Sequence, residues 1–173
     1  MYKRFVPYMY QQSVLDINYI KLKKQGIKCI LFDLDNTLVE SSNNKMDKNI
    51  QNLLVKLSKE FKIIIVSNNF KRKIKSICDI INIDFISFCL KPLTLKLKKL
   101  FKYENISLNE VCIIGDQLIS DVLVGKKLKI KTILVDPLNS KDLIVTKINR
   151  LLERKIFKEL SKLKLLERGS YYE

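Results

Sequence analysis

Short apolar runs alternate with longer, helix-periodic segments along this chain, and this alternation most constrains its fold. The run Ile63-Ile64-Ile65-Val66 is β-branched throughout and is followed by Ser67-Asn68-Asn69, which is typical of a strand buried on both faces. We expect further strands over 27–32, 85–88, 111–114 and 132–135, with helices over about 47–59, 71–80, 94–101 and 119–128. Such alternation predicts an α/β fold: a Rossmann-like, doubly wound, mostly parallel sheet with helices on both faces.

The length of 173 residues, 47% of them apolar, predicts a single domain over 1–173 with a substantial core. Residues 1–26 are expected to form an N-terminal extension, and residues from about 146 to 168 a C-terminal amphipathic helical segment. No apolar run approaches the roughly 18–20 residues that span a bilayer, and the N-terminus is a poor secretory signal. We therefore expect a cytoplasmic protein.

The charge is strongly basic: 33 Lys and Arg against 18 Asp and Glu give a net charge of +15. This charge favours phosphate-rich partners, namely nucleic acid, anionic lipid or phosphorylated metabolites. The abundance of Lys, Asn and Ile is also typical of an AT-rich coding sequence, so the charge alone does not choose a partner.

The chain contains no histidine, which excludes Ser-His and Cys-His nucleophile pairs. The four cysteines form no C-x-x-C pair, so a zinc site would need unusual ligands; they are Cys29, Cys78, Cys89 and Cys112. Buried, reduced thiols are expected. Acid–base chemistry must therefore fall to carboxylates, lysines or tyrosines.

Polar residues follow three of the expected strands. Asp33 and Asp35 end the first, Ser67 ends the second, and Asp116 follows Gly115 at the end of the fourth. In open parallel sheets, reactive groups gather at the carboxyl edge. Two neighbouring carboxylates repel each other, and a bound cation relieves that repulsion. One carboxylate can attack phosphorus while the other transfers protons.

Each of these features also has a simpler interpretation. Asp33-x-Asp35 fits a solvated turn, Ser67 and Asp116 can cap helices, and Lys91 is one of many lysines. The combined order of acid pair, hydroxyl, lysine and acid pair, each after an expected strand, favours a phosphoryl-transfer site over these separate interpretations.

This order resembles the four-motif pattern of the haloacid dehalogenase-like (HAD) phosphatases, and Asp33-Leu34-Asp35-Asn36-Thr37-Leu38 is similar to their first motif. The resemblance implies a phosphate monoester hydrolase with Mg²⁺ as cofactor. Asp33 would be the nucleophile, transiently phosphorylated, and a metal ligand. Asp35 would be the general acid/base, with its backbone carbonyl on the metal, and Asp116 a further metal ligand.

The remaining motifs imply roles in the same way. Ser67 would bind the phosphoryl group, Lys91 would stabilise it, and Asp121 would support the site or the water shell of the metal. Asn68 is a lesser candidate for contact with the substrate phosphate. Cap insertions usually select substrates in this superfamily, but segments 34–66 and 68–90 are too short for a cap of ~50 residues or more. We therefore expect no sizeable cap domain and an open site.

The flanks resemble a narrower branch, the YqeG-type phosphatases of subfamily IIIA, which are related to mitochondrial phosphatidylglycerophosphate phosphatases. The resembling residues include Pro7, Asp16, Ser120-Asp121-Val122 and the segment from Asn149 to Arg154. Phosphatidylglycerophosphate is the implied candidate substrate, and a soluble phosphometabolite is the alternative. Aromatic and basic residues at the N-terminus and the C-terminal segment suit peripheral contact with the inner face of a membrane. Packing on the domain or a dimer contact are the alternatives for the C-terminal segment.

Two other classes of function remain open. The charge and the basic C-terminal segment fit a non-enzymatic RNA- or ribosome-binding protein, which is less favoured because no recognised RNA-binding motif is evident. A receiver-like phosphoacceptor also combines an acid cluster, a hydroxyl and a lysine, but Asp35 favours rapid hydrolysis over a stored phosphoryl group. The oligomeric state is not predicted.

Overall fold

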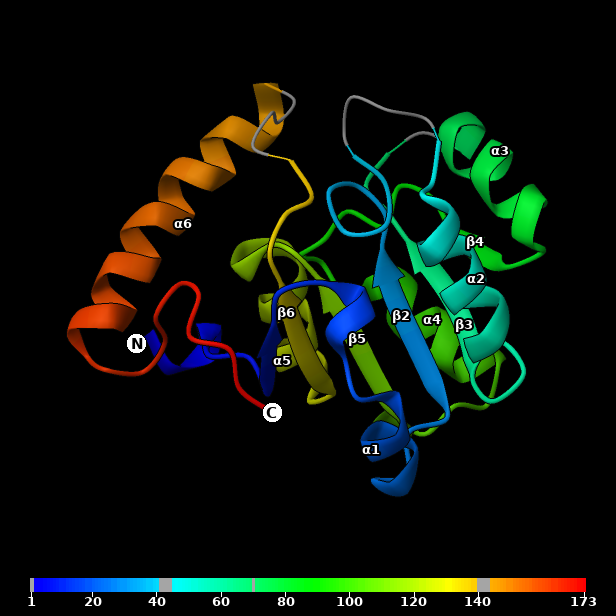
Figure 1. Ribbon diagram of the computed structural model, residues 1–173, viewed down its shortest axis with the longest axis horizontal. Coiled ribbons are helices and arrows are strands. Elements are labelled where there is room, and N and C mark those ends of the chain that lie inside the picture. The colour runs from blue at the N-terminus through cyan, green and yellow to red at the C-terminus, as the bar shows by residue number, and fades with distance from the viewer. Residues whose placement is uncertain (1, 41–44, 70, 140–143) are drawn as a thin grey trace.

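The computed structural model describes residues 2–40, 45–69, 71–139 and 144–173 (Figure 1). One sheet has the strand order β1-β6-β5-β2-β3-β4, and each neighbouring pair is parallel. The strands are β1 (Met9–Gln11), β2 (Cys29–Asp33), β3 (Lys62–Val66), β4 (Asp84–Ile86), β5 (Val111–Gly115) and β6 (Lys131–Val135). The predicted α/β fold with a parallel sheet is confirmed, and five of these strands lie within two residues of the expected ranges.

Helices cover both faces of the sheet. Their bounds are α1 (Tyr19–Lys24), α2 (Lys48–Leu57), α3 (Lys71–Ile81), α4 (Leu95–Tyr103), α5 (Leu123–Leu128) and α6 (Ile144–Lys162). Side chains of α2 and α3 share one core cluster, and those of α4 and α5 share another. The helix expected over 119–128 is α5 preceded by a single π-helical turn, η4 (Leu118–Val122). Short 3-10 helices are η1 (Tyr2–Phe5), η2 (Val14–Asp16) and η3 (Leu108–Glu110).

Side chains alternate along each strand, so neighbouring residues contribute to the two separate cores on opposite faces of the sheet. Ile30 and Phe32 of β2 pack with α2 and α3, whereas Cys29 and Leu31 pack on the opposite face with α4 and α5. All five residues of β2 are buried, as expected for a central parallel strand. Burial of each large apolar side chain stabilises the fold by about 1.5–3 kcal/mol.

The strand order places a topological switch point between β2 and β5. After β2 the chain builds β3 and β4 on one side, then crosses to β5 and β6 on the other. Phe32 pairs with Ile114, so the carboxyl ends of β2 and β5 lie next to each other. Ligands of open α/β sheets bind in the crevice at such a point. Asp33 and Asp116 are thereby brought to the same edge.

Residues 1–26, expected as an extension, contribute a strand to the sheet. β1 pairs with β6, with Met9 opposite Ile133 and Gln11 opposite Val135. A bridge from Tyr10 to Tyr172 joins this strand to the C-terminal segment. A three-residue strand carries little local signal, because its stability comes from partners more than 120 residues away.

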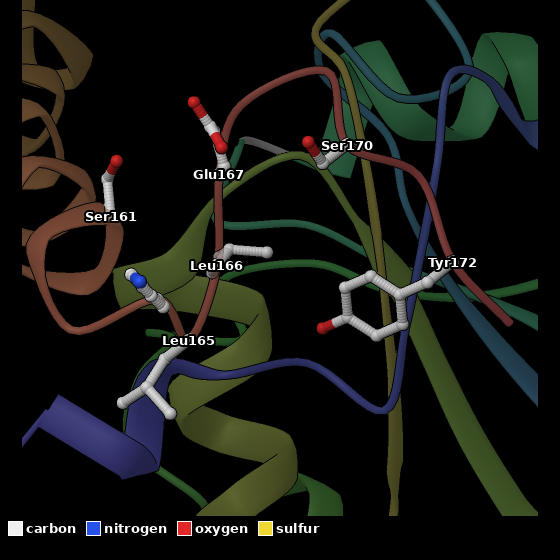
Figure 2. A pocket seen from close by; sticks show the side chains of 7 residues that line it. Ser161, Leu165, Leu166, Glu167, Ser170 and Tyr172 are labelled. Carbon is white, nitrogen blue, oxygen red and sulfur yellow. The ribbon is translucent and has the colours of Figure 1, made fainter.

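The C-terminal segment begins as α6 and then folds back on the N-terminal region. Of the expected apolar stripe, Leu160 is buried, whereas Leu151, Leu152 and Leu163 are exposed. The side chain of Ile148 lies outside the described part of the molecule. A pocket lies beside the end of α6 (Figure 2), and its volume is about 270 Å³. It is lined by Ser161, Lys164, Leu165, Leu166, Glu167, Ser170 and Tyr172. Within the described residues, no helix is both long and apolar enough to cross a membrane.

The cysteines are free and buried, as expected for structural thiols. Burial raises the pKa of Cys29 and of Cys78 to about 12, so neither is a thiolate at neutral pH. These thiols behave as small apolar groups in the core.

Candidate active site

Three buried carboxylates meet at the switch point. Asp33 ends β2, Asp116 follows β5 and Asp121 lies on η4; one oxygen from each lies within 4.8 Å of the other two. Parallel strand ends bring the first two together, and the π-helical turn returns Asp121 toward β5. The sequence predicted Asp33 and Asp116 as neighbours and Asp121 as a supporting acid.

Gly115 allows this close approach. A Cβ atom at this position would collide with the carboxyl group and the Cβ of Asp121. The Oδ2 atom of Asp121 accepts a hydrogen bond from the backbone N–H of Gln117 at 3.1 Å, which closes the turn. The Gly-Asp sequence at the strand end therefore serves packing as well as chemistry.

Lys91 inserts its ammonium group between two of the acids. Its Nζ atom lies 2.5 Å from Oδ1 of Asp33 and 2.5 Å from Oδ1 of Asp121, and only 2% of the side chain is exposed. Burial opposes its charge, but the two carboxylates outweigh burial and raise the pKa of Lys91 above its usual value. Lys91 is therefore a cation fixed inside the site.

Asn68 holds the backbone of Lys91 from both sides. The N–H of Lys91 donates to Oδ1 of Asn68 at 2.8 Å, and Nδ2 of Asn68 donates to the carbonyl of Lys91 at 3.1 Å. Asn68 thus orients the lysine; its expected contact with a substrate phosphate stays a prediction.

Asp35 lies beside the second strand end. Its Oδ2 atom accepts hydrogen bonds from the hydroxyl of Ser67 at 3.3 Å and from Nδ2 of Asn69 at 2.6 Å. The Ser67 hydroxyl also accepts from the N–H of Asn69 at 3.0 Å. The side chain of Asp35 is therefore held by Ser67 and Asn69, is only half-buried, and is not one of the three clustered acids.

The hydroxyl of Thr37 bridges the acids of β2 and β5. Its Oγ1 atom lies 3.4 Å from Oδ2 of Asp33 and 3.3 Å from Oδ1 of Asp116. We did not single out Thr37 from the sequence. Its place in the first motif, four residues after Asp33, was the available signal.

Arg150 reaches the site from α6. Its Nη2 atom forms an ion pair with Oδ2 of Asp116, and its Nη1 atom donates to Oε2 of Glu153 at 3.0 Å. Neither residue was predicted as functional, because each lies more than 30 residues from Asp116 and α6 reads as an ordinary amphipathic helix. Their place in a segment that resembles the YqeG-type branch was the only signal.

Burial and mutual repulsion disfavour the ionised forms of the clustered acids, so a positive charge bound among them would be stabilising. Burial raises the pKa of Asp33 well above its usual value, and Asp121 and Asp116 add to the rise while Lys91 opposes it. Burial likewise raises the pKa of Asp116 to about 7, against the effect of Arg150. A cation bound among these oxygens would favour their ionised forms.

The donor set fits a hard divalent cation. The clustered side chains are carboxylates, with neither thiolate nor imidazole among them. Oxygen ligands of this kind suit Mg²⁺ or Ca²⁺ better than softer metals. Asp33, Asp116 and Asp121 would hold the ion.

The structure thus gathers every predicted site residue at one edge of the sheet. Asp33, Asp116, Asp121 and Lys91 form the centre, Asp35 and Ser67 flank it, and Asn68 braces the lysine. Their catalytic and ligand roles stay predictions. This arrangement can present a carboxylate nucleophile beside a cation site and a second carboxylate for proton transfer.

Sequence comparison identifies related proteins. The family described as mitochondrial PGP phosphatase matches residues 2–139. The probable phosphatase YqeG of Bacillus subtilis (strain 168) is 33% identical over 161 residues, which cover 92% of this chain and 94% of that protein. The residues matched by the family include every predicted site residue.

Solved structures of HAD hydrolases share the fold of this chain. A predicted HAD-like family hydrolase from Porphyromonas gingivalis has a TM-score of 0.55 at 13% identity and covers 73% of this chain and 98% of its own. A HAD family enzyme from Bacteroides thetaiotaomicron, solved as a magnesium complex, has a TM-score of 0.52 at 15% identity and covers 70% and 98%. The chain has the fold of these HAD hydrolases, and by its sequence it belongs to the mitochondrial PGP phosphatase family and is a YqeG-type phosphatase.

Proposed function

We propose that this phosphatase hydrolyses phosphatidylglycerophosphate with Mg²⁺ as cofactor, through an aspartyl-phosphate on Asp33. One observation carries the proposal: Asp33 is ion-paired with Lys91 and lies in one cluster with Asp116 and Asp121 at the switch point. A bound Mg²⁺ would offset the charge of a phosphoryl group as it meets the carboxylates.

The residues of the site account for both halves of the reaction. A carboxylate oxygen of Asp33 forms a bond to phosphorus while the ester P–O bond breaks, and Asp35 gives a proton to the leaving oxygen. Asp35 then takes a proton from water, whose oxygen attacks phosphorus and releases the Asp33 carboxylate with inorganic phosphate. Ser67 and Asn69 orient Asp35 for both transfers. Lys91 balances negative charge on the phosphoryl oxygens.

The loop that carries Lys91 supports a lipid substrate. Leu90 and Leu93 are each 54% exposed and Phe88 is 38% exposed, although Cys89 and Lys91 between them are buried. Phe88 and Leu90 adopt left-handed φ angles of 48° and 56°, which are unfavourable for bulky side chains. The strained backbone directs large apolar groups outward beside the buried Lys91, where acyl chains or a bilayer surface could contact them.

Two lysines border this loop. Lys96 donates to the carbonyl of Ser87 at 3.0 Å and lies 5.9 Å from the ring centre of Phe88. Lys127 donates to the carbonyl of Pro92 at 3.1 Å. Basic groups around exposed apolar side chains match the chemistry of an anionic lipid surface. The family description names a PGP phosphatase, which agrees with this substrate.

Phosphate release should be measured with phosphatidylglycerophosphate in mixed micelles and with a soluble aryl phosphate, before and after metal removal. We expect turnover of both, a preference for the lipid, loss of both with chelator and recovery with Mg²⁺. Turnover of soluble phosphates alone would reject the lipid substrate and favour a phosphometabolite. Full activity after exhaustive metal removal would reject the cofactor.

A further inference from the structure

The C-terminal helix contacts a predicted metal ligand directly. Besides the ion pair from Nη2 of Arg150 to Oδ2 of Asp116, the Nη1 atom donates to the backbone carbonyl of Asp116 at 3.2 Å. The side chain of Asp116 is fully buried, and that of Arg150 is 13% exposed. One guanidinium therefore holds both the side chain and the main chain of this acid.

Glu153 completes the contact one helical turn later. Its Oε2 atom accepts from Arg150, and its Oε1 atom accepts from the backbone N–H of Ile119 at 3.1 Å. Its side chain is 1% exposed, and a carboxylate buried this deeply is tolerated only with such partners. Ile119 belongs to η4, the turn that also carries Asp121. The two residues of α6 thus hold both parts of the 116–121 segment.

The two oxygens of Asp116 have different surroundings. Oδ2 is bound to Arg150, whereas Oδ1 lies 3.3 Å from the hydroxyl of Thr37, which in turn donates toward Asp33. Oδ1 is thereby turned toward the other acids. Lys91 and Arg150 together face four carboxylates, those of Asp33, Asp116, Asp121 and Glu153, so negative groups outnumber positive ones around the site.

We propose that Arg150 and Glu153 are positioning residues, through which α6 orients Asp116 and the η4 turn and so sets the affinity of the site for its divalent cation. This inference rests on the proposed metal dependence. Partners that orient metal ligands typically contribute 10- to 100-fold to metal affinity or activity, roughly the effect expected here. Because coupling is reciprocal, metal binding must also stabilise the docking of α6.

Direct Mg²⁺ binding to the full chain, measured by calorimetry without substrate, tests the proposal. Arg150→Ala should weaken Mg²⁺ affinity about 10- to 100-fold, and added methylguanidinium should restore part of it. Arg154→Ala is the matched control, since Arg154 is exposed on the same helix and carries the same charge. Hydrogen exchange over 150–160 should slow when Mg²⁺ binds to wild type, but not in Arg150→Ala.

Affinity of Arg150→Ala equal to or tighter than that of the Arg154→Ala control would overturn the positioning role. If Arg150→Ala does not fold, Glu153→Gln serves instead: it keeps an acceptor for Ile119 but loses the charge facing Arg150. Unchanged Mg²⁺ affinity in that variant would equally reject the inference. Wild-type protein that binds no Mg²⁺ would reject the proposed metal dependence itself, so the two failures are distinguishable.

Discussion

Lys91 shows how a common residue type becomes part of a catalytic centre. The chain has 33 basic residues, and only the position of Lys91 between Ser67 and Asp116 in the motif order distinguishes it from the others. In the fold its ammonium group is enclosed by Asp33 and Asp121. Lys91 therefore affects the stability of the fold as well as the chemistry of the site, because its removal leaves two buried carboxylates without their shared cation.

Replacement of Lys91 by Met should therefore lower the free energy of unfolding by about 3–5 kcal/mol in metal-free protein, since one partner of a buried ion pair is lost. Urea unfolding measures this change. Lys98→Met, on the exposed side of α4, is the control and should alter stability by less than about 0.5 kcal/mol. Equal stability of the two variants would show that Lys91 does not neutralise the acids.

Asp116 predicts a pH dependence of stability. Because the pKa of Asp116 is raised to about 7 in the fold, the folded chain between about pH 4 and pH 7 holds a proton that the unfolded chain has released. The free energy of unfolding of metal-free protein should therefore fall as pH rises through this window. Saturating Mg²⁺ binds the ionised carboxylates and should reduce or reverse the fall.

Thermal melts of wild type and Asp116→Asn, with and without Mg²⁺, test this dependence. The variant cannot ionise at position 116, so its metal-free melting temperature should fall less steeply with pH. Identical slopes for the two proteins would contradict the raised pKa of Asp116.

Asp33 and Asp116 could be predicted from the sequence, because Asp33 directly follows an apolar run and Asp116 is separated from one by Gly115 alone. Thr37 and Arg150 could not be chosen, for different reasons. Thr37 resembles any turn residue, and the contact of Arg150 with Asp116 depends on how α6 docks on η4. Local pattern carries no information about that docking.

At the scale of elements, the strong central strands were predictable and the weak edge was not. β2, β3 and β5 are continuous apolar runs buried on both faces, which is a strong local signal. β1 has three residues and depends on β6 and Tyr172, while the π-helical turn of η4 looks helical in sequence. Elements that are stabilised by residues far away in the sequence have no local signal and become visible only in the structure.

The apolar loop around Lys91 makes a prediction at this scale. Leu90→Asn combined with Leu93→Gln should lower kcat/KM for phosphatidylglycerophosphate in micelles about 10-fold or more, because two apolar contacts with lipid are removed. Turnover of a soluble aryl phosphate should be nearly unchanged. The asparagine also tolerates the left-handed φ angle of position 90.

Leu108→Gln is a suitable control, because Leu108 is exposed on η3 just before β5, at the opposite edge of the sheet from the site. It should leave activity on both substrates unchanged. An equal loss of lipid and soluble turnover in the loop variant would mean that the loop supports the site without contacting lipid.

For the whole molecule, strand order joins fold to chemistry. From β2 the chain builds the sheet outward in one direction and then in the other, so Asp33 and Asp116, more than 80 residues apart in sequence, meet at one edge of the sheet. Alternating strands and helices predicted this sheet, but not that its outer edge would be closed by both termini. The net charge of +15 favours association of the whole molecule with phosphate-bearing partners.

The central claim is that Asp33 carries the phosphoryl group. The most direct test is to quench the enzyme during turnover of a phosphate-labelled substrate with Mg²⁺ and locate the label by peptide mapping. A hydroxylamine-sensitive label on the peptide containing Asp33, absent in Asp33→Asn together with phosphate release, is the predicted result. Phosphate release by Asp33→Asn at the wild-type rate would contradict it.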